Sequence, residues 1–191
     1  FIHAPFKSDL ISGKADKDHN STSIVFQISF KTTIGGSIKS RAIFGGDADH
    51  YVWEKVKSIS ENNGNEDKLK WNLFLAPHHC SWTFFNDTPY DENTEPKDYS
   101  LEFLDYGETN AHIIASSKKI KNEKPNPPHY PAKTEYEGKV KKGYFRNTAV
   151  NKSEKAPKPL EFEISDSGTK LKKVAATVAT GMLGTSSHRA G

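Results

Sequence analysis

The sequence predicts an α/β fold built of stacked layers, and three patterns support this prediction. Residues 24–30 and 38–44 alternate apolar with polar side chains, as strands do when one face is buried. Residues 49–62 instead repeat apolar side chains at helical spacing. Residues 71–76, WNLFLA, show no such alternation, which is typical of a short strand buried on both faces. Strands of both kinds around a helix indicate sheet and helix layers that share one core.

Turn and stop signals set the boundaries of the elements in the first half of the chain. Residues 1–6, FIHAPF, look like the end of a strand. The segment TTIGGS at 32–37 supplies a turn, so we expect residues 24–44 to form a β-hairpin. The helix expected at 49–62 has its stop signal in ENNGN at 61–65.

The second half of the chain continues the succession of loops, helices and strands. We expect a loop at 83–98, a short helix near 97–107, a strand at 110–117, a loop at 117–131, a helix at 132–143 and a hairpin at 160–174. Four prolines exclude regular structure from the second loop: Pro125, Pro127, Pro128 and Pro131. The closing hairpin is expected to turn at its DSG segment.

Length and composition predict one domain with a packed core. The chain has 191 residues, and we expect the domain to occupy residues 1–175 and a flexible tail to follow at 176–191. The chain begins at Phe1 and not at Met, so we expect a fragment of a longer protein. Cys80 is the single cysteine, which excludes a disulfide framework and makes a reducing cytoplasm the expected compartment. No segment approaches the ~18 apolar residues of a membrane span.

Polar side chains able to bind metal follow three of the expected strands. Asp47 comes after residues 41–44 through two glycines, His78 and His79 follow WNLFLA through a proline, and His129 lies in the proline-rich loop. Ligands in layered α/β folds usually lie on loops just beyond strand ends. Imidazole nitrogen and carboxylate oxygen are the usual non-sulfur ligands of zinc, so these residues form a candidate zinc site.

Each of these signals also has a structural explanation. Gly45 and Gly46 are expected to let the backbone bend so that Asp47 turns toward a shared site. An Asp after two glycines is, however, more often a turn or helix N-cap residue. A His-His pair is as often a hydrogen-bonded surface pair as a metal site.

Four short motifs carry a resemblance to a known family: NSTS at 20–23, GGD at 45–47, PHHCS at 77–81, and IIASS with PNPPHYP within 113–131. In this order they resemble the second half of the metallo-β-lactamase fold. The closest branch is that of the DNA-uptake competence proteins of the ComEC type and related metallohydrolases. The resemblance covers residues 1–175. It implies half of an αββα sandwich, a mixed sheet with flanking helices, and a two-metal zinc site at the edge of the sheet.

The resemblance also implies a role for each site residue. Asp47 would bridge two metals, and one of His78 and His79 would bind the second metal. Such sites hydrolyse esters, phosphodiesters or amides with a metal-bound hydroxide. Ser81 and His129 would be secondary candidates, for a hydrogen bond or for contact with the leaving group or a phosphate.

The chain departs from the family in three ways. The His-x-His-x-Asp-His motif of the first half, which supplies most metal ligands, is absent, so the N-terminal half of the same domain is the expected partner and the chain alone is expected to be inactive. Cys80 stands where the family has Gly, and could add a soft ligand or a redox-sensitive thiol. For the family's additional His upstream of Asp47, His19 is preferred over His3 because it directly precedes a strand.

Two other functions remain open at this stage. The first is a non-catalytic interaction or scaffold module that keeps the fold without a full metal site. The second is nucleic-acid binding through the Lys-rich segments 118–124 and 139–142. Aromatic residues are interleaved with these lysines: Tyr130, Tyr136, Tyr144 and Phe145. Interspersed glutamates dilute the positive charge, and the 27 Lys and Arg residues nearly balance 24 Asp and Glu residues, which disfavours this interpretation.

Overall fold

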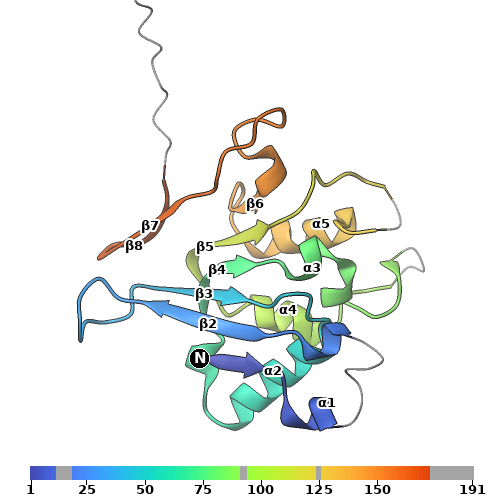
Figure 1. Cartoon of the computed structure of the whole chain (residues 1–191), viewed down its shortest axis with the longest axis horizontal. Helices are drawn as coiled ribbons and strands as arrows, with labels where there is room; N and C mark the ends of the chain where they lie inside the picture. The colour runs from blue at the N-terminus through green and yellow to red at the C-terminus, as the bar shows by residue number, and fades with distance from the viewer. Residues whose placement is uncertain (12–18, 91–93, 124–125, 173–191) are drawn as a thin grey trace, which may run out of the picture.

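A six-stranded mixed sheet forms the centre of the computed structural model, which describes residues 1–11, 19–90, 94–123 and 126–172 (Figure 1). The strand order is β1-β2-β3-β4-β5-β6. The strands of this sheet are β1 (Ile2–Ala4), β2 (Val25–Phe30), β3 (Ser40–Phe44), β4 (Trp71–Leu75), β5 (Gly107–Ala115) and β6 (Phe145–Asn147). A separate two-stranded sheet pairs β7 (Phe162–Ser165) with β8 (Gly168–Leu171).

Helical segments connect the strands. The α-helical segments are α1 (Lys7–Ile11), α2 (His50–Asn62), α3 (Pro77–Cys80), α4 (Asp98–Leu104) and α5 (Tyr130–Lys139). Short 3-10 turns are η2 (His19–Thr22), η3 (Glu66–Lys68), η4 (Trp82–Phe84) and η6 (Thr148–Val150). None of the described helices is both long enough and apolar enough to cross a lipid bilayer.

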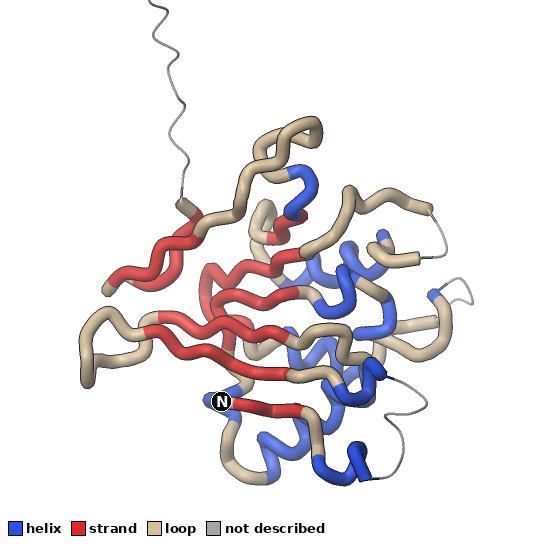
Figure 2. Tube along the Cα trace, viewed as in Figure 1, coloured by secondary structure: helices blue, strands red, loops and turns tan. Residues whose placement is uncertain are grey.

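The direction of winding puts the long helices on one face of the sheet. Strands β1, β2 and β3 are antiparallel neighbours, whereas β3, β4, β5 and β6 run parallel and follow one another in sequence. Nearly all connections between parallel strands are right-handed. When each connection leads to the neighbouring strand in the same direction across the sheet, right-handed connections place all their helices on the same face. The helices α2, α4 and α5 accordingly gather on one side of the sheet (Figure 2).

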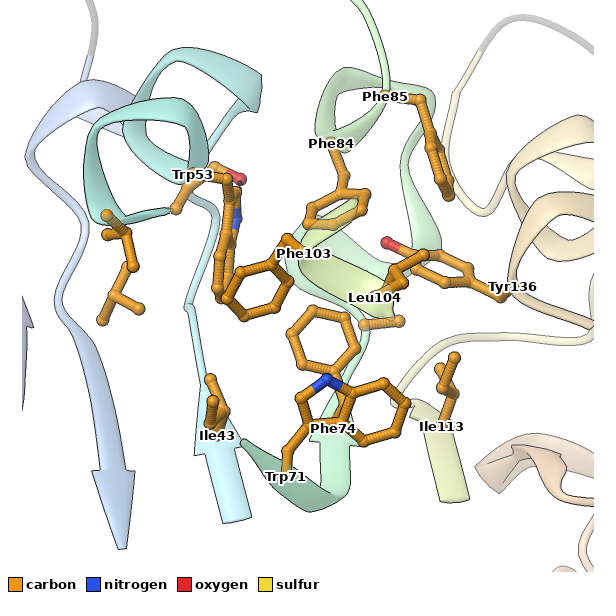
Figure 3. Close-up of a cluster of buried hydrophobic side chains, with 14 of the residues drawn as sticks. Ile43, Trp53, Trp71, Phe74, Phe84, Phe85, Phe103, Leu104, Ile113 and Tyr136 are labelled. Carbon is orange, nitrogen blue, oxygen red and sulfur yellow. Dashed lines mark hydrogen bonds between the residues drawn. The ribbon is translucent and has the colours of Figure 1, made fainter. Parts of the chain in front are cut away.

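The core lies between that face and the helices. One row of the sheet, read through the strand register, runs through Gln27, Ile43, Phe74, Ile113 and Phe145. Phe74 is fully buried and contacts one aromatic ring from each of the three helices, namely Trp53, Phe103 and Tyr136 (Figure 3). Ring centroids 5.4 Å apart at 72° for Trp53 and Phe74 give the edge-to-face geometry that aromatic pairs prefer.

The opposite face of the sheet is also apolar, but no described helix packs on it. Its register row is Ile2, Phe26, Phe44, Leu75 and Ile114, followed by Arg146 on β6. The side chains of this row are half-buried or exposed, and Ile2 is 72% exposed.

The β7–β8 hairpin covers one part of this face. Phe162 packs on His112 with ring centroids 5.1 Å apart, and Thr169 donates a hydrogen bond to the Ser40 hydroxyl at 2.5 Å. The free part includes a shallow groove of about 580 Å³ whose apolar lining residues are Phe1, Ile2, Ile24, Phe26 and Ile28.

The α/β class expected from the sequence is confirmed, and so are most of its elements. The hairpin expected at 24–44 is β2 and β3, and the helix expected at 49–62 begins at His50 because Asp49 is its N-cap. The closing hairpin is β7 and β8. Among the helices and strands, α1, α3 and the three-residue strand β6 were not predicted, and α5 begins at Tyr130, inside the segment expected to be a loop. The tail expected at 176–191 lies outside the described residues.

Candidate functional site

The predicted site residues lie at the edge of the sheet where β3, β4 and β5 end. Because these strands are parallel, the loops that follow them emerge at the same edge, and β2 begins there (Figure 1). The His78 N–H donates to the Gly46 carbonyl at 2.9 Å, and Gly46 lies close to Ser23. His79 Nδ1 lies 2.7 Å from the Ser116 carbonyl oxygen. The four motif segments are therefore neighbours in space.

The two glycines before Asp47 have different roles. Gly46 has φ +53°, a left-handed conformation that Gly adopts without steric cost, so it provides the bend predicted from the sequence. Gly45 does not have a positive φ. Its Cα is pressed against the buried Trp53 ring, and a Cβ there would overlap the indole. Gly45 is therefore required for close packing of the loop on α2, and its carbonyl also accepts from the Ala48 N–H at 3.0 Å in the turn that carries Asp47.

Three consecutive residues at this edge adopt a left-handed backbone. His78, His79 and Cys80 have φ values of 46°, 57° and 69°. Each such residue other than Gly costs roughly 1–2 kcal/mol, and strain of this kind concentrates at functional sites. The α3 segment is therefore a strained left-handed turn, held at one end by the hydrogen bond from the His78 N–H to the Gly46 carbonyl.

Substitutions at the exposed His79 should reveal this strain. His79→Gly should raise the free energy of unfolding by about 0.5–1 kcal/mol, because Gly removes the steric cost of φ +57°. His79→Val should lower it by about 1–2 kcal/mol, because a β-branched residue is the least tolerant of positive φ. Urea unfolding of the two variants measures both effects. The same pair at the exposed strand residue Thr109 should show the opposite order, and equal effects at both positions would rule out strain at His79.

The two adjacent histidines are oriented differently. Their ring centroids are 6.4 Å apart and the ring planes meet at 63°. His79 is exposed, and its Nδ1 faces the Ser116 carbonyl, an arrangement that fixes the proton on Nδ1 and leaves the lone pair of a neutral ring on Nε2. His78 is half-buried, and its Nδ1 is buried without a hydrogen-bond partner in the described part of the chain. Of the two, His79 is therefore the one whose ring could bind a metal through Nε2.

His129 is the N-cap residue of α5 and is tied to the backbone of the neighbouring turns. Its N–H donates to the Cys80 carbonyl, and its Nδ1 accepts from the Trp82 N–H, both at 2.9 Å. The Ser81 hydroxyl is 3.5 Å from the same nitrogen. A neutral His129 therefore carries its proton on Nε2, which makes it a hydrogen-bond donor and not a metal ligand.

The other predicted residues differ in exposure. Asp47 is exposed in the loop after β3, and His19 is exposed at the start of η2. His3 is buried in β1 with Nε2 3.1 Å from the Lys68 carbonyl oxygen. The Cys80 side chain is fully buried, and desolvation raises the pKa of its thiol to about 12. Cys80 is thus a protonated, inaccessible thiol, unlike the soft ligand or redox-sensitive group considered from the sequence.

The aromatic residues near the Lys-rich segments are used inside the protein. Tyr136 is fully buried, Phe145 stacks on it, and Tyr144 stacks on His112. Lys119 and Lys139 form ion pairs with Glu154 and Asp105. Of the four aromatic side chains considered for base stacking, Tyr136 is buried, Tyr144 and Phe145 are half-buried, and Tyr130 is exposed.

Sequence reasoning did not identify the groups that orient the histidines. These groups are the Ser116 carbonyl and the Trp82 N–H, which belong to the backbone and carry no residue-type signal. Within the described ranges, no group of three or more His, Cys, Asp or Glu side chains is arranged to hold a metal ion.

No family model, curated protein or solved structure matches this chain. The resemblance to the metallo-β-lactamase fold therefore depends on the four motifs and on their arrangement at one edge of the sheet.

Proposed function

We propose that the chain is the second half of a metal-dependent hydrolase of the metallo-β-lactamase fold, and that this edge contributes Asp47 and His79 to a zinc site. One observation carries the proposal. The GGD loop and the His-His turn, far apart in sequence, are joined by the hydrogen bond from the His78 N–H to the Gly46 carbonyl.

The residues at the edge fit a zinc site in part. His79 offers Nε2 with Nδ1 held by a backbone carbonyl, and Asp47 offers an exposed carboxylate. When bound, zinc supplies a hydroxide at neutral pH and stabilises the negative charge that develops on an ester or phosphodiester. Asp47 would bridge two ions by analogy with the family, and His129 would donate a hydrogen bond from its Nε2–H to a substrate or leaving-group oxygen. His78, the half-buried neighbour of His79, would not bind the metal itself.

The open face of the sheet supports the assignment to one half of a sandwich. Its register row is apolar from Ile2 to Ile114, which is the composition of a face that packs on another sheet at about 10 Å. The complementary half would bring this second sheet together with the His-x-His-x-Asp-His motif, which supplies the remaining ligands in the family.

The proposal predicts different behaviour for residues 1–191 alone and for a longer polypeptide that includes them. Alone, the chain should bind zinc weakly at this edge and should not hydrolyse bis-p-nitrophenyl phosphate, because its ligand set is incomplete. A polypeptide that also carries His-x-His-x-Asp-His within roughly a hundred residues upstream should hydrolyse it. Asp47→Asn should then lower kcat at least 100-fold. Asp105→Asn, at an exposed aspartate that follows α4, should leave kcat unchanged.

Two results would contradict the proposal. Tight, stoichiometric zinc together with phosphodiesterase activity from residues 1–191 alone would show that no complementary half is required. An upstream segment in which the motif's metal ligands are substituted would favour the scaffold function.

A further inference from the structure

A second group of polar side chains lies where α2 begins, and neither the motifs nor the proposed function uses it. His50, the first residue of α2, is 2% exposed. Its Nδ1 is 2.6 Å from the Tyr99 hydroxyl at the start of α4, and its Nε2 is 3.6 Å from Asp87 Oδ1. Tyr51 donates a hydrogen bond to the other carboxylate oxygen of Asp87 at 3.2 Å. Two helices and the loop after η4 thus meet at one imidazole.

The spacing of His50 and Asp87 leaves the buried His50 Nε2 without a hydrogen bond among the described residues. At 3.6 Å, Nε2 and Oδ1 are too far apart for a hydrogen bond, and Nε2 is buried without any partner in the part of the chain that the structure describes. An unsatisfied buried polar atom is costly and requires an explanation. Two ligands of one tetrahedral ion, each about 2.1 Å from the metal, are roughly 3.4 Å apart. The pair therefore has the spacing of co-ligands.

We propose that His50 Nε2 and Asp87 Oδ1 bind a zinc-like divalent cation, at a site separate from Asp47 and His79. Asp87 is half-exposed, so water completes the coordination. With only two protein ligands the site is weak, in accord with the absence of any group of three ligands among the described residues. The bound cation would fasten the loop after η4 to the first turn of α2.

The surroundings of the two ligands match those of a metal site. Metal-binding histidines donate their second ring N–H to an oxygen, and the Tyr99 hydroxyl is positioned to accept from His50 Nδ1. The Tyr51 hydroxyl holds Asp87 by donating a hydrogen bond to the carboxylate oxygen that does not face His50.

The charge states are also suitable. Burial lowers the pKa of His50, against the opposing effect of Asp87 and Asp49, so the imidazole is neutral as a ligand must be. Burial raises the pKa of Asp87, but hydrogen bonds from its own backbone and Tyr51, together with nearby His50 and Lys97, lower it by more. Among the charged groups near His50, Asp49 and Glu54 favour a cation and Lys97 opposes it.

A zinc titration of the full chain, followed by NMR of the histidine rings, tests the inference. Zinc should shift the ring resonances of His50, and the same concentrations of magnesium should not, because magnesium prefers an all-oxygen site. Asp87→Asn should weaken this binding at least tenfold, and Tyr51→Phe should weaken it by about tenfold. Both changes are at half-exposed or exposed positions and leave the core intact. His50→Asn provides a further check, with folding confirmed by circular dichroism.

Asp47→Asn separates this site from the one in the proposed function. It should leave the His50 response to zinc unchanged, while Asp87→Asn should leave any response of His79 unchanged. The inference is overturned if the His50 ring does not respond to millimolar zinc, if magnesium acts equally, or if Asp87→Asn binds as the wild type does. A response of His79 alone would retain the proposed function and remove this second site.

Discussion

Gly45→Ala should lower the free energy of unfolding by about 3 kcal/mol, the upper end of the cost of overpacking a core. The added methyl group would overlap the Trp53 indole. Trp53 cannot move aside easily, because it is fully buried and its ring packs against Phe84 and Phe103 at centroid distances of 5.5 and 4.5 Å (Figure 3). The loop that carries Asp47 would therefore be displaced or the core expanded.

Gly138→Ala is the matched control for this change. Gly138 lies in α5, is exposed, and has open space around the position of a Cβ. Ala should stabilise the protein there by about 0.5–1 kcal/mol, because Gly is a poorer helix residue. Chemical denaturation measures both variants. A Gly45→Ala protein as stable as the wild type would mean that Trp53 does not fix the position of the GGD loop.

Acidification from pH 6.5 to pH 4 should destabilise the folded protein through two buried histidines. Desolvation lowers the pKa of both His3 and His112 to about 4, against a value of 6.5 for the unfolded chain. Between these two values the unfolded chain binds protons that the folded protein does not, so stability falls as the pH falls. The loss should be on the order of 3 kcal/mol for each histidine, complete near pH 4, and absent above pH 6.5.

His112→Phe tests the contribution of one of these histidines. The His112 ring stacks on Tyr144 with centroids 4.3 Å apart, and a phenyl ring can keep that stack without binding a proton. The urea midpoint of the variant should depend on pH about half as steeply as that of the wild type between pH 6.5 and 4. A variant with the full pH dependence would assign the acid sensitivity to other groups.

The sequence predicts the parts of the fold that depend on local periodicity. The alternation at 24–30 and 38–44 corresponds to β2 and β3, and the helical spacing at 49–62 corresponds to α2. The short strand β6 could not be predicted, because three residues are too few to show a period in hydrophobicity. Its strand conformation depends on pairing with β5, which is distant in sequence. The bare apolar face was also missed, since it appears only when the register aligns residues from five strands.

The sequence predicts that the candidate site residues lie at the ends of neighbouring strands, but it does not predict their backbone conformation or the burial of their side chains. The glycines, Asp47 and the His-His pair mark the end of each strand, and parallel pairing of β3 and β4 places them together. The left-handed turn at His78, His79 and Cys80 has no sequence signal, because non-Gly residues rarely adopt it. The sequence also gives no signal for the buried His50 nitrogen that lacks a hydrogen bond in the described part of the chain, because its burial depends on the contact between α2 and α4.

The strand order from β3 to β6, which places the helices on one face of the sheet, also affects how readily the chain aggregates. A sheet covered by helices on one face alone exposes apolar side chains to solvent on the other, and such surfaces promote aggregation and engage chaperones. The strand order therefore affects aggregation as well as the core, because it decides which face of the sheet the helices leave open.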